Sequence, residues 1–262
     1  RIRGKLFEEY LPYLNLSLVA IDEAHCISQW GHDFRPEYLN IKSIKEVWAK
    51  VPFLALTASA TQDVLLDIQE QLKLQKATIF KKSFRRENIF YQVQYSENKQ
   101  QFIIQYFLKN PETGIVYCRS RRKTEELTLL LQQNNISATA YHAGMPKEIR
   151  MNNQLAWMHN KVKVMVATTA FGMGIDKPDV RTVIHFDAPE HLEAYYQETG
   201  RAGRDSKDAK AITLYNYSDI ERLENSTELY FPPEKYLRKI YQAVCDYLQI
   251  AIGSEPNEYF DF

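Results

Sequence analysis

Residues 16–25 read Leu16-Ser17-Leu18-Val19-Ala20-Ile21-Asp22-Glu23-Ala24-His25. The first six have the length and β-branched content of a strand buried on both faces, as in a parallel sheet. Two adjacent carboxylates follow at the carboxyl end of this strand, where open α/β sheets bind their ligands. Carboxylate oxygens suit Mg²⁺, which keeps several of its own waters. The stretch therefore predicts a rigid strand that presents acids to a metal and a water, with a solvated turn as the alternative for the tetrapeptide alone.

Composition limits the class of protein. The chain has 262 residues, enough for one large domain or two ordinary ones, and 33 basic residues balance 33 acidic ones. Net charge therefore says nothing about a polyanionic partner, and any nucleic-acid contact must come from local patches. The apolar runs are too short for a membrane span, and the first residues are no signal peptide. Three cysteines without CxxC spacing indicate reduced thiols and no cysteine zinc site, so we expect a cytoplasmic protein, nucleoid-associated if bacterial, with no membrane partner.

From residue 89 onward, strand and helix patterns alternate regularly. The expected strands are 89–95, 114–118, 137–141, 162–167, 181–186 and 210–215, and the expected helices are 98–109, 121–133, 146–158 and 191–199. Such βα alternation predicts an α/β fold with a parallel sheet and right-handed crossovers.

The residues before this region predict only part of a domain. They supply strands 16–21 and 53–56 and a helix at 61–72, too few to close an α/β domain. We therefore expect residues 1–80 to be the C-terminal part of a first domain, 81–88 a polar linker, 89–217 a second domain, and 218–262 the helical start of a C-terminal region. The apolar stripe in 236–248 has helical spacing and predicts a core-facing helix.

Two further patterns indicate anion and ligand contacts. Arg201 and Arg204 lie three residues apart with small residues between them, and arginine offers bidentate geometry for phosphate. A basic surface turn is the alternative. Gly172 and Gly174 permit close backbone approach to a ligand, and Asp176 beside them is suited to sugar hydroxyls, although a plain loop is the better interpretation of this segment when it is taken alone.

In combination, these patterns resemble the RecQ group of superfamily 2 DNA helicases, over residues 16–216. The most specific stretch is 22–38, which is similar to the acidic helicase motif joined to the aromatic-rich loop of RecQ proteins. Further motif-like segments are 55–61, 116–120, 141–145, 166–178 and 197–205. The resemblance implies two RecA-like parallel-sheet motor domains, the first of them incomplete here, followed by a helical C-terminal segment.

The resemblance also implies catalytic roles for five residues, with ATP and Mg²⁺ as cofactors. Asp22 would hold Mg²⁺ through water, and Glu23 would orient and deprotonate the attacking water. His25 would link the nucleotide site to the aromatic loop. Arg201 and Arg204 would reach the triphosphate from the second domain, with Arg204 as the arginine finger.

Binding and coupling roles follow from the same resemblance. The ATP-binding residues would be Gln197, Asp176 and Gly174. The DNA-binding residues would be Trp30, Phe34, Arg35, His142, Thr168 and Thr169. The residues that couple the ATP and DNA sites would be Thr57, Ser59 and Thr61.

The implied activity is ATP-dependent 3′–5′ unwinding of DNA, with single-stranded and duplex DNA as partners. Two features depart from the family pattern. The sequence contains no GxxxxGK[ST] phosphate-binding loop, so we expect a chain that begins partway through the first motor domain and does not hydrolyse ATP alone. No zinc site is visible either, since Cys245 is the one cysteine near the C-terminal end. A non-catalytic nucleic-acid-binding module derived from a helicase is the alternative. A DEAH-type RNA helicase fits the tetrapeptide but not the loop that contains Trp30.

Overall fold

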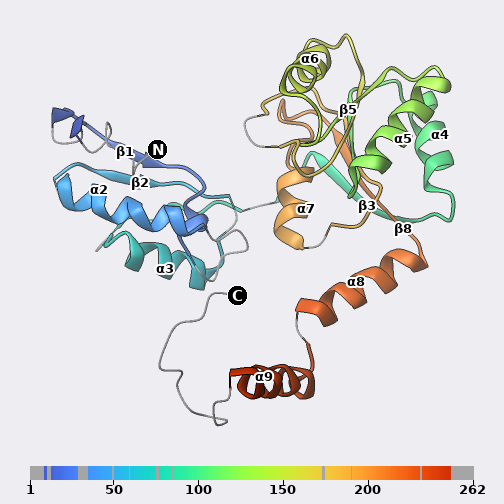
Figure 1. The fold of residues 1–262 in the computed structure, drawn as a ribbon. Coiled ribbons are helices and arrows are strands. Elements are labelled where there is room, and N and C mark those ends of the chain that lie inside the picture. Colours follow the sequence, from blue (N-terminus) through green and yellow to red (C-terminus); the bar gives the residue numbers. More distant parts are fainter. Residues whose placement is uncertain are drawn as a thin grey trace. The chain divides into compact units, whose positions relative to one another are not determined.

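The computed structural model describes residues 9–10, 13–28, 35–48, 50–58, 60–74, 77–83, 85–172, 175–189, 191–230 and 232–248 (Figure 1). Its contacts divide the chain into two units, residues 1–86 with 191–197, and residues 87–190 with 198–262. Among the described residues, no helix is both long and apolar enough to cross a membrane.

The first unit contains a parallel pair of strands, β1 (Val19–Ile21) and β2 (Phe53–Ala55), with Val19 opposite Phe53. The helices α2 (Ile41–Val47) and α3 (Gln62–Gln71) accompany them. Their core consists of Ile21, Ala24, Ile27, Ile41, Val64, Ile68 and Leu72.

The expectation of a first strand buried on both faces is wrong for the described residues. In β1 only Ile21 is buried, and Leu18 just before the strand is 51% exposed. In the neighbouring β2, Leu54 is 41% exposed. The described part of this sheet has two strands, which give each other one hydrogen-bonded edge and leave apolar side chains uncovered.

The second unit is a six-stranded parallel sheet in the order β3-β8-β7-β4-β6-β5. The strands are β3 (Ile89–Tyr95), β4 (Gly114–Tyr117), β5 (Ala138–Tyr141), β6 (Val164–Ala167), β7 (Thr182–His185) and β8 (Ala209–Tyr215). Each lies within two residues of the strand that the sequence predicts. The parallel α/β class is thereby confirmed.

Helices cover both faces of this sheet because its side chains alternate between two cores. Val116 of β4 points into a core with residues of α4 (Lys99–Lys109) and α5 (Arg121–Gln133). Its neighbours Ile115 and Tyr117 point into the opposite core, which contains Trp157 of α6 (Lys147–Met158). Fully buried central strands are typical of a parallel sheet with both faces covered.

The helices after the sheet differ from the sequence prediction in their exposure. The helical region expected from residue 218 contains two helices, α8 (Tyr217–Tyr230) and α9 (Glu234–Leu248), because the ring of Pro233 favours the start of a new helix. The stripe expected to face a core is exposed, with Tyr236 at 57% and Tyr247 at 83%, whereas Cys245 is buried. Periodicity identifies an apolar face but does not determine whether this chain covers it.

Candidate functional site

The paired acids of the first unit lie directly after β1, at its carboxyl end. Glu23 has a left-handed backbone, with φ 49° and ψ 44°, which is uncommon for a residue other than glycine. Its N–H donates to Asp22 Oδ1 at 2.9 Å, and this bond fixes the turn. The Asp22 side chain is exposed, and that of Glu23 is 40% exposed. The strand end therefore presents two carboxylates to a ligand from a constrained turn.

His25 connects these acids with the end of the neighbouring strand. Its side chain is 2% exposed, and Nδ1 lies 2.8 Å from Thr57 Oγ1 and 3.4 Å from Glu23 Oε2. Backbone bonds join the same two segments, since the N–H of Ala24 donates to the carbonyl of Leu56 at 2.9 Å. One buried imidazole thus lies within contact distance of both the Thr57 hydroxyl and the Glu23 carboxylate.

The aromatic-rich loop is described only at its two ends. Its ends meet where the N–H of Arg35 donates to the carbonyl of Cys26 at 2.8 Å, one residue beyond His25. Trp30 and Phe34 lie outside the described residues, as do Ser59 and Gly174 of the other predicted sites. Arg35 is half-buried. Burial and the nearby Cys26, Glu23 and Asp22 raise the pKa of the Tyr38 hydroxyl, while Arg35 opposes the shift.

Thr61 caps α3, as the sequence predicts, because its Oγ1 accepts the N–H of Val64 at 3.4 Å. Asp67 of the same helix accepts the Ser28 hydroxyl at 2.6 Å. The segment that follows His25 is therefore tied to α3.

Three predicted DNA-binding residues of the second unit lie together after neighbouring strands, at the carboxyl edge of the sheet. His142 follows β5, and Thr168 and Thr169 follow β6, which pairs with β5. The His142 ring is buried, and its Nε2 lies 2.8 Å from Glu125 Oε1. Thr168 is nearly buried and Thr169 is exposed. Of these three residues, Thr169 has the exposed side chain, and its hydroxyl is a group of the kind that binds phosphate.

Basic residues border the same edge at the amino end of α5. Ser120 caps this helix by accepting the N–H of Lys123 at 3.1 Å. Arg119, Arg121 and Arg122 beside it have exposed side chains. A helix amino end with exposed guanidinium groups favours anions.

The two arginines of the 197–205 segment are held by the loop after β6. Arg201 Nη1 donates to the carbonyl of Gly172 at 2.5 Å. Arg204 Nη1 donates to the carbonyl of Ile175 at 2.8 Å and lies 2.9 Å from Asp176 Oδ1. Both guanidinium groups are therefore fixed by backbone acceptors within one loop, and Asp176 pairs with an arginine.

Gly172 leaves the space that the Arg201 guanidinium group occupies. A Cβ built on Gly172 would lie 2.5 Å from Arg201 Nη2, which is too close for any contact. On the other side, the Tyr117 hydroxyl donates to the carbonyl of Phe171 at 2.9 Å. Burial raises the pKa of Tyr117, and the nearby Arg201 opposes the shift. The Tyr117 ring stacks on His185, whose Nε2 lies 2.8 Å from Glu198 Oε2.

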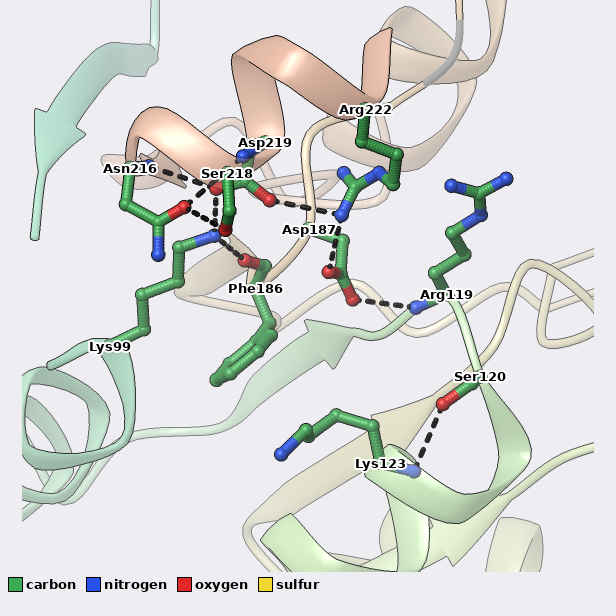
Figure 2. A network of polar contacts seen from close by, with 10 residues as sticks. All are labelled: Lys99, Arg119, Ser120, Lys123, Phe186, Asp187, Asn216, Ser218, Asp219 and Arg222. Carbon is green, nitrogen blue, oxygen red and sulfur yellow. Dashed lines mark hydrogen bonds and ion pairs between the residues drawn. The ribbon is translucent and has the colours of Figure 1, made fainter. Parts of the chain in front are cut away.

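A partly buried network that no sequence pattern predicted lies at the carboxyl ends of β4, β7 and β8 (Figure 2). It joins Lys99, Asp187, Asp219 and Arg222. Asn216 and Asp219 cap α8 reciprocally, since each accepts the backbone N–H of the other. The spacing of Asn216 and Asp219 is a capping signal that marks this helix start, but nothing in the sequence links it to Lys99 or Asp187.

A magnesium site formed by protein alone is not visible among the described residues, since no three His, Cys, Asp or Glu side chains gather there. Mg²⁺ needs fewer, because it is bound by one or two carboxylates together with waters and nucleotide phosphates. The exposed oxygens of Asp22 fit that mode.

Comparison with known proteins assigns the chain. The family described as "Helicase conserved C-terminal domain" matches residues 98–206. The ATP-dependent helicase SGS1 of Saccharomyces cerevisiae is 42% identical over 241 residues, 88% of this chain and 17% of that protein. The ATP-dependent DNA helicase RecQ of Bacillus subtilis is 44% identical over 222 residues, 84% of this chain and 38% of that protein. RecQ of Haemophilus influenzae is 43% identical over 243 residues, 92% of this chain and 39% of that protein. The chain spans less than two fifths of the length of each relative.

Among solved structures, S. cerevisiae Dbp5 bound to RNA and ADP BeF3 is similar, with a TM-score of 0.63 and 16% identity, over 83% of this chain and 57% of that one. At this identity the likeness shows the fold alone. The curated relatives, by contrast, are 42–44% identical to this chain over aligned segments of 222–243 residues. The chain belongs to the RecQ family of helicases.

Proposed function

We propose that this chain is part of an ATP-dependent DNA helicase that moves 3′ to 5′ along one strand and separates the duplex. The observation that carries the proposal is the position of His25, whose Nδ1 lies 3.4 Å from the Glu23 carboxylate and 2.8 Å from the Thr57 hydroxyl. His25 is buried and connects Glu23, which would orient the attacking water, with Thr57 at the end of the neighbouring strand. Such a connection is suited to ATP hydrolysis that responds to the binding of DNA. The names of the curated relatives support the same activity.

In this proposal, the residues of the first unit act on water. The Glu23 carboxylate accepts a proton from the attacking water as a general base, a role worth about 10²–10⁴ in rate. Asp22 would hold a hydrated Mg²⁺, which neutralises phosphate charge when it is bound. His25 and Thr57 hold the Glu23 carboxylate in one orientation.

The second unit supplies cations and a DNA surface. Arg204, with Arg201 beside it, would stabilise charge on the transferred phosphoryl group once the two units close on the nucleotide. The segment at Gly174 and Asp176 would contact the nucleotide, as would Gln197 of α7 (Leu192–Thr199), which is grouped with the first unit.

The DNA surface would run along the carboxyl edge of the second sheet. Thr168, Thr169, His142 and the arginines at the amino end of α5 would contact backbone phosphates of single-stranded DNA. In the first unit, Trp30, Phe34 and Arg35 would contact the same strand. Stacking of an aromatic ring on a base is worth about 1–3 kcal/mol and tolerates any sequence.

A non-catalytic nucleic-acid-binding module is the second candidate, because these 262 residues contain no GxxxxGK[ST] loop. Asp22, Glu23, Arg201 and Arg204 count against it, since strand binding alone requires neither a water-orienting acid nor paired arginines.

One experiment distinguishes the two candidates. ATP hydrolysis is measured with and without oligo(dT), first for this chain and then for the chain joined to the upstream sequence of its reading frame. The helicase proposal expects no hydrolysis by the chain alone and DNA-stimulated hydrolysis by the extended protein, abolished by Glu23→Gln. An extended protein with a phosphate-binding loop and a rate equal to that of Glu23→Gln would refute it.

A further inference from the structure

The Asp187 carboxylate connects two loops and a helix of the second unit. Asp187 follows β7 by two residues, and β7 pairs with β4 so that His185 lies opposite Tyr117. Its Oδ2 accepts the backbone N–H of Arg119 at 2.9 Å, and its Oδ1 lies 3.2 Å from Arg222 Nη1 of α8 (Figure 2). One side chain therefore holds the start of the loop between β4 and α5 and, at the same time, the first turns of α8.

Buried charges fix the other end of this connection. Arg222 Nη1 lies 3.0 Å from Asp219 Oδ1, and Asp219 also binds the Lys99 ammonium group. Lys99 Nζ donates to the carbonyl of Phe186 at 2.7 Å, next to Asp187. The side chains of Lys99 and Asp219 are 5% and 4% exposed. Two cations and two carboxylates balance, so the network is neutral as a whole.

The loop held by Asp187 carries the basic groups of the proposed DNA surface. Asp187 contacts only the backbone N–H of Arg119 in this bond, and Figure 2 shows the Arg119 guanidinium group extending away from the Asp187 carboxylate. Ser120 comes next and caps α5, at whose amino end the side chain of Arg121 is exposed. The backbone that carries these basic groups is therefore held by the Asp187 carboxylate.

We infer that Asp187 and Arg222 are positioning residues for DNA binding, through which α8 sets the geometry of the basic segment 119–122 at the amino end of α5. The inference rests on the proposed function, because it assigns a control element to the DNA surface of that proposal. A disturbance of α8 reaches the loop through Arg222 and the Asp187 carboxylate. α8 leads into the C-terminal residues of the chain. A change in that region can therefore alter the affinity for DNA through this network.

The test measures the affinity of the full chain for fluorescein-labelled oligo(dT), by fluorescence anisotropy across a series of salt concentrations. Asp187→Ala removes both contacts, whereas Asp187→Asn keeps an oxygen for the Arg119 N–H but loses the charge that faces Arg222. We expect Asp187→Ala to weaken binding about tenfold and to lower the salt slope by about one, since one phosphate contact is lost. Arg222→Gln should weaken binding in the same direction, and Asp187→Asn should do so less.

Amide hydrogen exchange at Arg119 distinguishes a local loss of the Asp187 bond from a general loss of stability, which would speed exchange throughout the unit. In Asp187→Ala this N–H should exchange faster while the central strand β4 stays protected. Arg181→Gln is the matched control, since Arg181 and Asp205 form a pair that is 16% and 23% exposed at the amino edge of the same sheet. It should lower stability and leave oligo(dT) affinity and Arg119 exchange unchanged.

The outcomes separate the inference from the proposed function. If Arg121→Gln weakens binding while folded Asp187→Asn and Arg222→Gln bind like the wild type, the positioning role is refuted and the DNA surface stands. If Arg121→Gln binds like the wild type, the DNA surface itself falls. Should Asp187→Ala fail to fold, Arg222→Gln decides, because Arg222 is 28% exposed and Asp219 keeps its bond to Lys99.

Discussion

The two units use the end of a parallel strand in opposite ways. After β1 of the first unit, Asp22 and Glu23 reach toward solvent from a constrained turn, and one buried imidazole touches Glu23. After β6 of the second unit, the loop does the reverse, since its carbonyls at Gly172 and Ile175 accept bonds from two arginines. The difference suits the two proposed roles, because a general base must be accessible to water, while an arginine that stabilises charge must be held in place beforehand.

The largest expected effect comes from removal of the arginine finger. In the extended protein with its phosphate-binding loop, Arg204→Gln should lower DNA-stimulated ATP hydrolysis by about 10³ or more, in the range of other arginine fingers. Steady-state hydrolysis with saturating oligo(dT) measures it. Arg238→Gln is the control, because Arg238 pairs with Glu234 on the surface of α9. A loss below tenfold would show that Arg204 only supports the loop.

A side chain added at Gly172, against the Arg201 guanidinium group, should have a smaller effect on ATP hydrolysis. Gly172→Ala places a Cβ against Arg201, so we expect about tenfold slower hydrolysis and a KM for ATP that changes less than kcat. The control is Gly114→Ala, whose Cβ would lie 2.7 Å from the Phe107 ring in the core. It should lower the thermal midpoint at least as much and spare kcat at temperatures where it is folded. Equal loss of kcat in both variants would contradict a specific role of Gly172 in positioning Arg201.

Thr57→Val tests the contact between Thr57 and His25 beside the acids of the first unit. This change keeps the shape of the side chain and removes the hydroxyl that lies 2.8 Å from His25 Nδ1. A lost buried hydrogen bond costs about 1–3 kcal/mol, and we expect DNA stimulation of hydrolysis to fall several-fold while basal hydrolysis changes little. Stopped-flow phosphate release with and without oligo(dT) measures both rates. If both fall equally, Thr57 supports the turn and does not couple the sites.

The smallest expected effect is a pH dependence of stability at the amino edge of the second sheet. There Arg181 and Asp205 form an ion pair with a structural role. The bond from Arg181 lowers the pKa of Asp205 in the folded chain. A lowered carboxyl pKa adds stability that is present above the unfolded pKa and is lost as pH falls through the folded value. The difference in denaturation midpoint between wild type and Arg181→Gln should therefore shrink as pH falls from neutral to about 3. A difference independent of pH would contradict this ion pair.

The sequence predicted most of the fold because its strongest signals are local. Continuous apolar runs such as 164–167 identify strands buried on both faces, and Thr61 identifies the start of α3. The exposed face of α9 was mispredicted because periodicity reports amphipathicity and not coverage. The break between α8 and α9 follows from the prolines at 232 and 233, which the apolar pattern obscured.

The sequence predicted the residues of the candidate site better than the contacts between them. The resemblance named Glu23, His25 and Thr57, and the structure brings these three together. It placed Asp176 at a ribose, a role that stays a prediction, while the structure pairs that carboxylate with Arg204. The connection of Lys99 with Asp219 spans 120 residues of chain. No local pattern encodes such a pair, since it arises from the order of strands in the sheet.

The central claim is that Glu23 of one unit and Arg204 of the other act on the same phosphoryl group. Single-turnover ATP hydrolysis by the extended protein, measured for Glu23→Gln, Arg204→Gln and the double variant, tests it most directly. If both act in one transition state, the double variant should be little slower than the slower single variant. Two losses that simply multiply would contradict the claim.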